Sequence, residues 1–170
     1  DIGGSNRLSR CKEQPGVQDG VADDIKGLID FTRGTDYFDY EGDCDLTKTR
    51  PDPFGEIYHS ELIVVGNPNA ETSFTSINQE AYWRNFNNYE AFKLQHENRE
   101  RMIYVGSNSG ALHAIKSSSG EETWAFVPPF IASKFPRIVN TNLNSEFGGG
   151  SNAIYGVEGS PTVHDMYFLH

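Results

Sequence analysis

The sequence predicts a mainly β fold of the propeller type, with a few antiparallel blades and short helical insertions. Glycine is abundant, at 17 of 170 residues, and tyrosine and phenylalanine are common. Long alternations of leucine, alanine, glutamate and lysine, which are typical of helical bundles, are missing. The third observation is a run of short strands and tight turns between Arg101 and Val127. A meander of this kind is the building unit of a propeller blade.

The predicted meander has three strands. The first is Arg101–Gly106, and a tight turn over Ser107–Gly110 follows it. Ala111–Ile115 is the second strand, Lys116–Gly120 the second turn, and Glu121–Val127 the third strand. Connections of about four to five residues suit antiparallel neighbours. Two prolines then end the sheet, because proline cannot donate a hydrogen bond to the ladder.

Two further segments have strand patterns. Residues 57–66 become β-branched towards their end, which favours a strand. Residues 156–168 have a similar pattern and are predicted to open another blade. The two segments form a weak internal repeat with a period of roughly 100 residues.

Helices are predicted at three places. An acidic pair at 23–24 precedes apolar residues at i, i+3 and i+4 spacing, which predicts a helix over 24–32 that Gly34 ends. Aromatic residues at helical spacing predict a second helix over 79–97. A short helical turn is expected over 130–135, after the sheet.

The chain divides into two parts. Residues 1–50 are predicted to be an N-terminal arm that contains the first helix, and residues 51–170 to form an incomplete set of propeller blades. The start at Asp1 is not an initiator sequence, and the last residues, 168–170, stop in mid-pattern. We therefore expect an internal piece of a longer protein.

The chain has two cysteines, Cys11 and Cys44. One disulfide between them fits an acidic, glycine-rich chain in an oxidising compartment. It would close a loop of roughly 33 residues, which the chain-entropy estimate values at about 3–4 kcal/mol. Two unrelated buried thiols are the alternative.

An acidic stretch lies around Gly42. Asp39, Glu41, Asp43 and Asp45 place carboxylates at alternating positions, the arrangement that calcium loops use. The glycine is misplaced for an EF-hand, and no glutamate closes the loop. The sequence therefore leaves two interpretations open, a calcium site and a solvated acidic turn. No other cofactor is expected.

Composition excludes two classes of partner. The net charge is −10 and the isoelectric point about 4.8, so a nucleic-acid backbone would be repelled. No apolar run approaches the roughly 18–20 residues of a membrane span.

No catalytic residue is predicted. Metalloprotease, nucleophile-elbow and nucleotide-binding motifs are absent. His59 and His164 each have an acidic residue nearby, but structural or surface roles are favoured, and His113 is expected to pack inside a strand. The sequence offers no partnered base for the serines considered as nucleophiles, Ser60, Ser107 and Ser160.

Three motifs resemble a known family. The strand pairs in residues 104–115 and 120–129 are similar to the signature blade of the PilY1-type proteins of type IV pilus tips. Residues 54–66 and 158–165 are similar to two further motifs of that family, and all occur in the family's order. The chain departs from the pattern at Lys116, where the family usually has aspartate.

The resemblance implies a quinoprotein-like β-propeller with no enzymatic activity. In it, Gly106, Gly110 and Gly120 shape the blade and Trp124 packs between neighbouring blades. The expected function is type IV pilus tip assembly and adhesion, at the cell surface and associated with the outer membrane of Gram-negative bacteria. Expected partners are pilins or minor pilins, a host or abiotic surface, and the rest of the same propeller.

Two alternatives are kept. One is a quinoprotein dehydrogenase with a pyrroloquinoline quinone, which would need several tryptophan blades and an acidic pair at the propeller axis. The other is an outer-membrane assembly scaffold. Under the adhesion hypothesis, contact is expected through residues 67–98 and the glycine-rich loop at 140–152, because loops on rigid scaffolds carry recognition.

Overall fold

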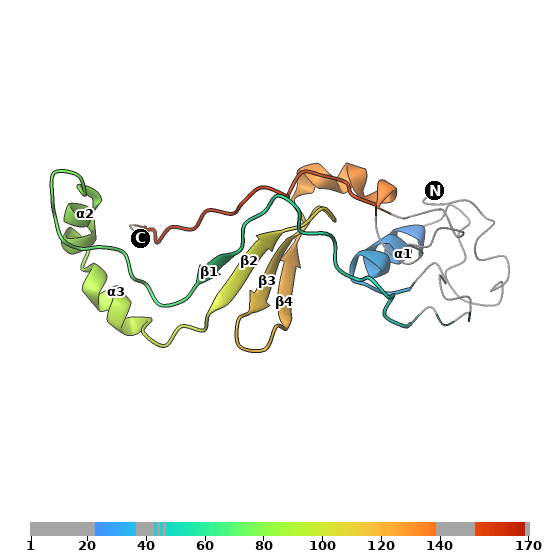
Figure 1. Cartoon of the computed structure of the whole chain (residues 1–170), viewed down its shortest axis with the longest axis horizontal. Coiled ribbons are helices and arrows are strands. Elements are labelled where there is room, and N and C mark those ends of the chain that lie inside the picture. Colours follow the sequence, from blue (N-terminus) through green and yellow to red (C-terminus); the bar gives the residue numbers. More distant parts are fainter. Residues whose placement is uncertain (1–22, 37–42, 44, 46, 139–151, 169–170) are drawn as a thin grey trace.

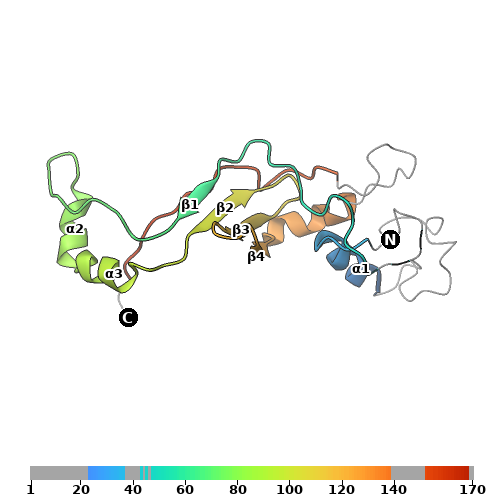
Figure 2. The ribbon, with the colours of Figure 1, turned by 60° about the horizontal axis from the view of Figure 1, so that its bottom comes forward.

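The computed structural model describes residues 23–36, 43, 45, 47–138 and 152–168. They form an elongated molecule with an antiparallel sheet in the middle (Figure 1). Helices α2 (Glu80–Phe86) and α3 (Tyr89–Gln95) lie at one end, and helix α1 (Asp23–Thr32) lies at the other. Figures 1 and 2 agree that the segment from 152 to 168 runs along the sheet towards α2 and α3.

The sheet is a four-stranded antiparallel meander with neighbours in chain order. Tyr104 pairs with Ile63 on one side and with Ala114 on the other. The predicted three-strand meander is confirmed, and one more strand is added before it. The strands are β1 (Ile63–Val65), β2 (Met102–Gly106), β3 (Leu112–Lys116) and β4 (Glu122–Phe126).

Glycine makes both turns of the meander. Gly110 has a φ of +81° and donates its N–H to the Ser107 carbonyl at 3.0 Å. Gly120 has a φ of +74° and donates to the Lys116 carbonyl at 2.9 Å. Residues with a Cβ adopt this backbone region at a cost, so both turns require glycine.

Two strand predictions were wrong in extent. Of residues 57–66, only Ile63–Val65 form a strand. Residues 156–168 have no ladder partner within the part of the chain that the structure describes. Gly156, Gly159 and Pro161 interrupt this segment, and proline removes a ladder donor. β-propensity alone does not make a strand, because a strand needs a neighbour to pair with.

Two of the three helix predictions are confirmed, and the third needs a correction. α1 covers the predicted helix, and a 3-10 helix, η2 (Pro129–Arg137), contains the predicted helical turn. The expected helix over 79–97 is broken into α2 and α3 at Asn87 and Asn88. Asn88 has φ 56° and ψ 47°, a left-handed conformation that asparagine tolerates better than most residues.

The fold is thus mixed, with a four-stranded sheet and four helices among the described residues. The mainly β prediction is right for the sheet, and a propeller is not shown. The apolar core lies outside the sheet, between α1, η2 and Ile154. Within the sheet, Val105 and Ala114 are fully buried, whereas every residue of β4 is exposed.

Among the residues that the structure describes, no helix is long and apolar enough to cross a membrane. Several predictions fall outside those residues and are not tested by the fold. They concern the arm over residues 1–22, the loop over 140–151, and Asp39, Glu41, Cys11 and Cys44.

Candidate functional site

The three resembling motifs meet at Gly106 of β2. Its N–H donates to the hydroxyl of Ser60 at 3.0 Å, and that hydroxyl donates to the Glu61 carbonyl at 3.0 Å. A side chain on Gly106 would overlap the carbonyl oxygen of Val157, so the C-terminal segment lies directly against the β2 backbone. Ser160 from the same segment accepts the N–H of Glu61 at 3.0 Å. We call this contact the motif junction.

The motif junction explains two of the serines structurally. Ser60 accepts one hydrogen bond and donates another, and Ser160 is bound to the backbone of Glu61. Both hydroxyls therefore join segments that lie far apart in the sequence. The glycine predicted as part of the blade motif is required by the close approach of another backbone.

The third serine has a partnered base, which the sequence analysis missed. The hydroxyl of Ser107 lies 2.8 Å from Nε2 of His113, and Nδ1 of His113 lies 2.5 Å from the carboxylate of Glu122. The order serine, histidine, carboxylate is that of a catalytic triad. Ser107 is fully buried, however, and its hydroxyl also lies 2.5 Å from that of Ser109. Because Ser107 has no exposed surface, a substrate has no access to its oxygen. The network therefore has a structural role and joins the turn at Ser107 to strands β3 and β4.

A β-bulge in the hairpin between β3 and β4 places His113 and Glu122 on one face. Ile115 pairs with Glu122 across a bulge, and His113 lies two residues before Ile115 on β3. Residues two apart on a strand share a face, so His113 and Glu122 are diagonal neighbours. The ring of Phe54 packs on His113 with centroids 4.1 Å apart. His113 is thus packed inside strand β3, as expected.

A cavity of about 770 Å³ lies beside the network. Its lining includes Trp124, Glu122 and His113 from the sheet, together with Leu28 of α1 and Phe135 of η2. The Trp124 ring is 43% exposed and contacts Tyr104 with centroids 5.8 Å apart. Trp124 is thus on a strand, as predicted, and part of its surface has no cover from the described residues.

A second pocket, of about 270 Å³, lies between α2, α3 and the C-terminal segment. We call it the α2–α3 pocket. Aromatic rings and two carboxylates form much of its lining, namely Glu80, Trp83, Tyr89, Phe92, Asp165 and Tyr167. Sequence reasoning assigned residues 67–98 to a contact region but did not find this pocket, because Asp165 comes from far along the chain.

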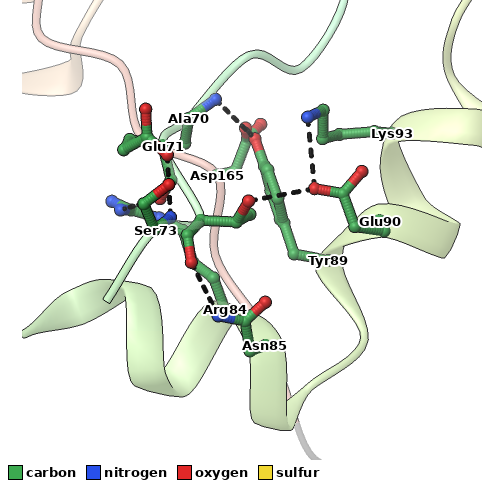
Figure 3. A network of polar contacts seen from close by, with 10 residues as sticks. Ala70, Glu71, Ser73, Arg84, Asn85, Tyr89, Glu90, Lys93 and Asp165 are labelled. Atoms are coloured by element: carbon green, nitrogen blue, oxygen red, sulfur yellow. Dashed lines mark hydrogen bonds and ion pairs between the residues drawn. The ribbon is translucent and has the colours of Figure 1, made fainter. Parts of the chain in front are cut away.

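Tyr89 links the pocket to the C-terminal segment. Its hydroxyl donates to Oδ2 of Asp165 at 2.5 Å and accepts the N–H of Ala70 at 3.2 Å (Figure 3). Burial raises the pKa of Tyr89 above 10.0, and the hydrogen bond to Asp165 raises it further. The phenol therefore remains a proton donor at neutral pH. Nη1 of Arg99 lies 3.9 Å from Oδ1 of Asp165, on the other side of the carboxylate.

The segment before α2 is bound to both helices (Figure 3). Arg84 donates to the Glu71 carbonyl at 2.9 Å, and Asn85 donates to the Thr72 carbonyl at 2.7 Å. The Thr72 hydroxyl donates to Glu90 of α3 at 3.1 Å. Residues 70–95 therefore form a connected unit.

Of the four proposed calcium ligands, the structure describes Asp43 and Asp45. Asp43 accepts the N–H of Asp45 at 2.9 Å and pairs with Lys48, and that lysine lowers the pKa of Asp43. Asp45 accepts the hydroxyl and the N–H of Thr47, and these bonds lower the pKa of Asp45. Among the described residues, no group of three or more metal-ligating side chains comes together.

The remaining candidate histidines lie on the surface. His59 and His164 are exposed, and the ring of His59 packs edge-on against Tyr58 with centroids 4.4 Å apart. Asp165, next to His164 in the sequence, accepts the hydroxyl of Tyr89.

Comparison with known proteins gives a distant relation. No family model and no solved structure matches the chain. It is 29% identical over 147 residues to the type IV pilus biogenesis factor PilY1 of Pseudomonas aeruginosa strain UCBPP-PA14, which covers 85% of this chain and 11% of that protein. A PilY1 homolog of Xylella fastidiosa is 33% identical over 113 residues, or 66% of this chain and 8% of that protein.

PilY1 of Pseudomonas aeruginosa strain PAO1 is 30% identical over 124 residues, which make up 73% of this chain and 10% of that protein. The chain thus spans only about a tenth of the length of these curated relatives. At about 30% identity, it is a distant homologue of a small portion of the PilY1 type IV pilus biogenesis factors.

Proposed function

We propose that this chain is part of the propeller of a PilY1-like pilus factor and acts without enzymatic activity in pilus assembly and adhesion. The motif junction carries this proposal. Segments 54–66, 104–115 and 158–165, each similar to a PilY1-type motif, come together around Gly106 in one packed contact. Residues that resemble the family therefore build the scaffold, and relation to PilY1 supports the role.

The exposed strand β4 supports the propeller. A propeller blade is a four-stranded sheet, and neighbouring blades cover its faces. The sheet has four strands, and β4 carries Trp124 and Phe126 with much of each ring uncovered. A neighbouring blade packed there would bury both rings and would give Trp124 its expected place between blades.

The unit over residues 70–95 is the proposed contact surface. Tyr82, Trp83 and Phe86 are exposed on α2, and the Tyr82 and Phe86 rings stack with centroids 6.2 Å apart. Exposed aromatic groups of this kind mark interaction sites. The proposed partners are pilins or minor pilins and a host or abiotic surface, reached at the pilus tip outside a Gram-negative cell.

The proposal includes a calcium site at Asp39, Glu41, Asp43 and Asp45 and a disulfide between Cys11 and Cys44. Calcium would have to displace Lys48 from Asp43. Calorimetric titration with calcium should give a saturable signal that Asp43→Asn removes and Asp52→Asn keeps. Thiol titration of the denatured, non-reduced chain should find no free cysteine. A flat titration or two free thiols would remove the corresponding part of the proposal.

The whole proposal is tested in a piliated strain whose own copy of the gene is deleted. A wild-type copy should restore surface pili and adherence, and a Gly106→Val copy should restore neither, because it breaks the motif junction. Gly159→Ala, where an added methyl group meets nothing within 4 Å, is the matched control. A deletion strain that makes normal pili and adheres normally would contradict the proposal.

A further inference from the structure

The α2–α3 pocket has aromatic walls that face solvent. Trp83 and Tyr167 are each 62% exposed, although both line the pocket. Ligand sites commonly combine apolar walls with a few polar groups. A ligand that covers these rings would remove their surface from water, which is favourable.

The charged groups of the pocket are already paired. Glu80 binds Arg84 with Oε2 and Nη2 2.7 Å apart. Asp165 accepts the Tyr89 hydroxyl and lies 3.9 Å from Arg99. A charged ligand would therefore compete with these contacts and find no unpaired opposite charge. The pocket favours a neutral ligand.

Polar atoms at the rim exclude a purely apolar ligand. The amide nitrogen of Asn87 donates to the Trp83 carbonyl at 2.9 Å, while its amide oxygen accepts nothing from the described part of the chain. Asp165 also lines the pocket, and a carboxylate has acceptor sites beyond the one that Tyr89 occupies. An apolar side chain would bury these atoms without hydrogen bonds, which is costly. The ligand must therefore carry hydroxyl groups.

We propose that the α2–α3 pocket binds one neutral hexose ring of a glycan. Its C–H face would cover Trp83, and its hydroxyl groups would bond to Asn87 and Asp165. A pyranose is neutral and combines an apolar face with hydroxyl groups around its edge. The apolar face suits the aromatic walls, and the hydroxyl groups can donate to the acceptor oxygens of Asn87 and Asp165. The volume of about 270 Å³ lies just below the roughly 300–1,000 Å³ of drug-sized sites, which fits a single ring.

The inference deepens the proposed function, because it takes the unit over residues 70–95 as the contact surface and names its ligand class. It is tested on the purified chain with methyl mannoside, methyl galactoside and methyl glucoside. A Trp124→Phe background leaves Trp83 as the single tryptophan, since the chain has two. Saturable fluorescence changes and saturation-transfer NMR should report binding of at least one glycoside.

Variants locate the binding. Trp83→Ala, made in the chain with Trp124 intact and followed by NMR, should weaken binding by about tenfold or more. Asn87→Leu should weaken it as well, and provides the test if Trp83→Ala fails to fold. Phe130→Ala is the control, because Phe130 is an exposed aromatic residue on η2 that does not line the pocket. Tetramethylammonium and acetate should not bind.

Three results would overturn the inference. They are no binding of any glycoside, binding that survives both Trp83→Ala and Asn87→Leu, and preferential binding of either ion. The proposed function fails separately. If the glycoside binds but a strain with Trp83→Ala adheres normally, the pocket is a glycoside site and the proposed role of the pocket in adhesion is wrong. If Trp83→Ala reduces adherence while no glycoside binds, the contact surface stands and the hexose is wrong.

Discussion

The guanidinium carbon of Arg50 lies 4.2 Å from the centroid of the Phe31 ring, and both residues are buried. Arg50 also donates to the carbonyls of Phe31 at 3.3 Å, Pro53 at 3.0 Å and Asp52. One side chain thus ties helix α1 to the loop that leads towards the sheet. No sequence pattern indicates this contact, because a single arginine in a loop has no period or motif.

Arg50→Lys should destabilise the chain. Lysine keeps the charge but has no planar fork, so it cannot reach three carbonyls and stack on Phe31 together. We expect a loss of about 1–3 kcal/mol, the range for a buried donor network that is left partly unsatisfied. Urea unfolding followed by circular dichroism measures it. Lys116→Arg, near the surface of the sheet, is the control. Equal stability of wild type and Arg50→Lys would contradict the stabilising role of the Arg50 contacts.

Gly106→Ala should also destabilise the chain, because its methyl group would overlap the Val157 carbonyl. Overpacking of this kind costs about 1–3 kcal/mol and sometimes more. In Gly159→Ala the new methyl group has open space and the change should be close to neutral. Thermal unfolding of both variants gives the comparison. If the two variants melt together at the wild-type temperature, the close packing at the motif junction is wrong.

Ser107→Ala should reduce the stability of the chain. The change removes the partner of Nε2 of the buried His113, which costs about 1–3 kcal/mol when nothing replaces it. Ser118→Ala, in the exposed turn, is the control. The wild-type chain should hydrolyse p-nitrophenyl acetate no faster than buffer. Hydrolysis above background that disappears in Ser107→Ala would show that the network is catalytic.

The Tyr89–Asp165 contact should make stability depend on pH in the alkaline range. The pKa of Tyr89 is raised in the folded chain, so the folded state keeps its proton above pH 10.0 while the unfolded state loses it. The unfolded state then binds fewer protons, and the free energy of unfolding falls as the pH rises. The contribution is complete below pH 10.0 and is lost as the pH passes the raised value.

Tyr89→Phe separates this effect from other alkaline changes. It should lower stability at neutral pH and flatten the fall above pH 10.0, which is the ordinary pKa of a tyrosine side chain. Tyr82→Phe, which changes an exposed ring on α2, should leave the stability at neutral pH close to that of wild type. Urea unfolding across the pH range, with tyrosinate absorbance, provides the measurement. Parallel profiles for Tyr89→Phe and wild type would contradict the contact.

The sequence predicted those elements of the fold that form between residues close together in the chain. The meander from Met102 to Phe126 and the helix α1 follow from turn glycines and apolar spacing, because each forms between near neighbours. The break at Asn88 was missed because asparagine is compatible with both a helix and a left-handed turn. The strand expected over 156–168 failed because ladder pairing depends on distant partners.

The candidate site was predictable to a lesser degree. Aromatic residues in the insertion pointed to a contact region, but the pocket needs Asp165, which is 76 residues from Tyr89. A regular hairpin register would place Glu122 on the face opposite His113, and only the β-bulge between Ala114 and Ile115 brings the two together. The place of Ser107 follows from the shape of the turn. Contacts between distant segments depend on the tertiary fold and leave no pattern in the chain.

The route of the C-terminal segment sets an order of folding. Strands β2 to β4 pair with their sequence neighbours, so they can form while later residues are still being synthesised. Ser160 and Asp165 make contacts that span 99 and 76 positions, so neither contact can form until residues 152–168 have been synthesised. Helices α2 and α3 and the sheet thus reach their final mutual placement only when the segment over residues 152–168 joins them.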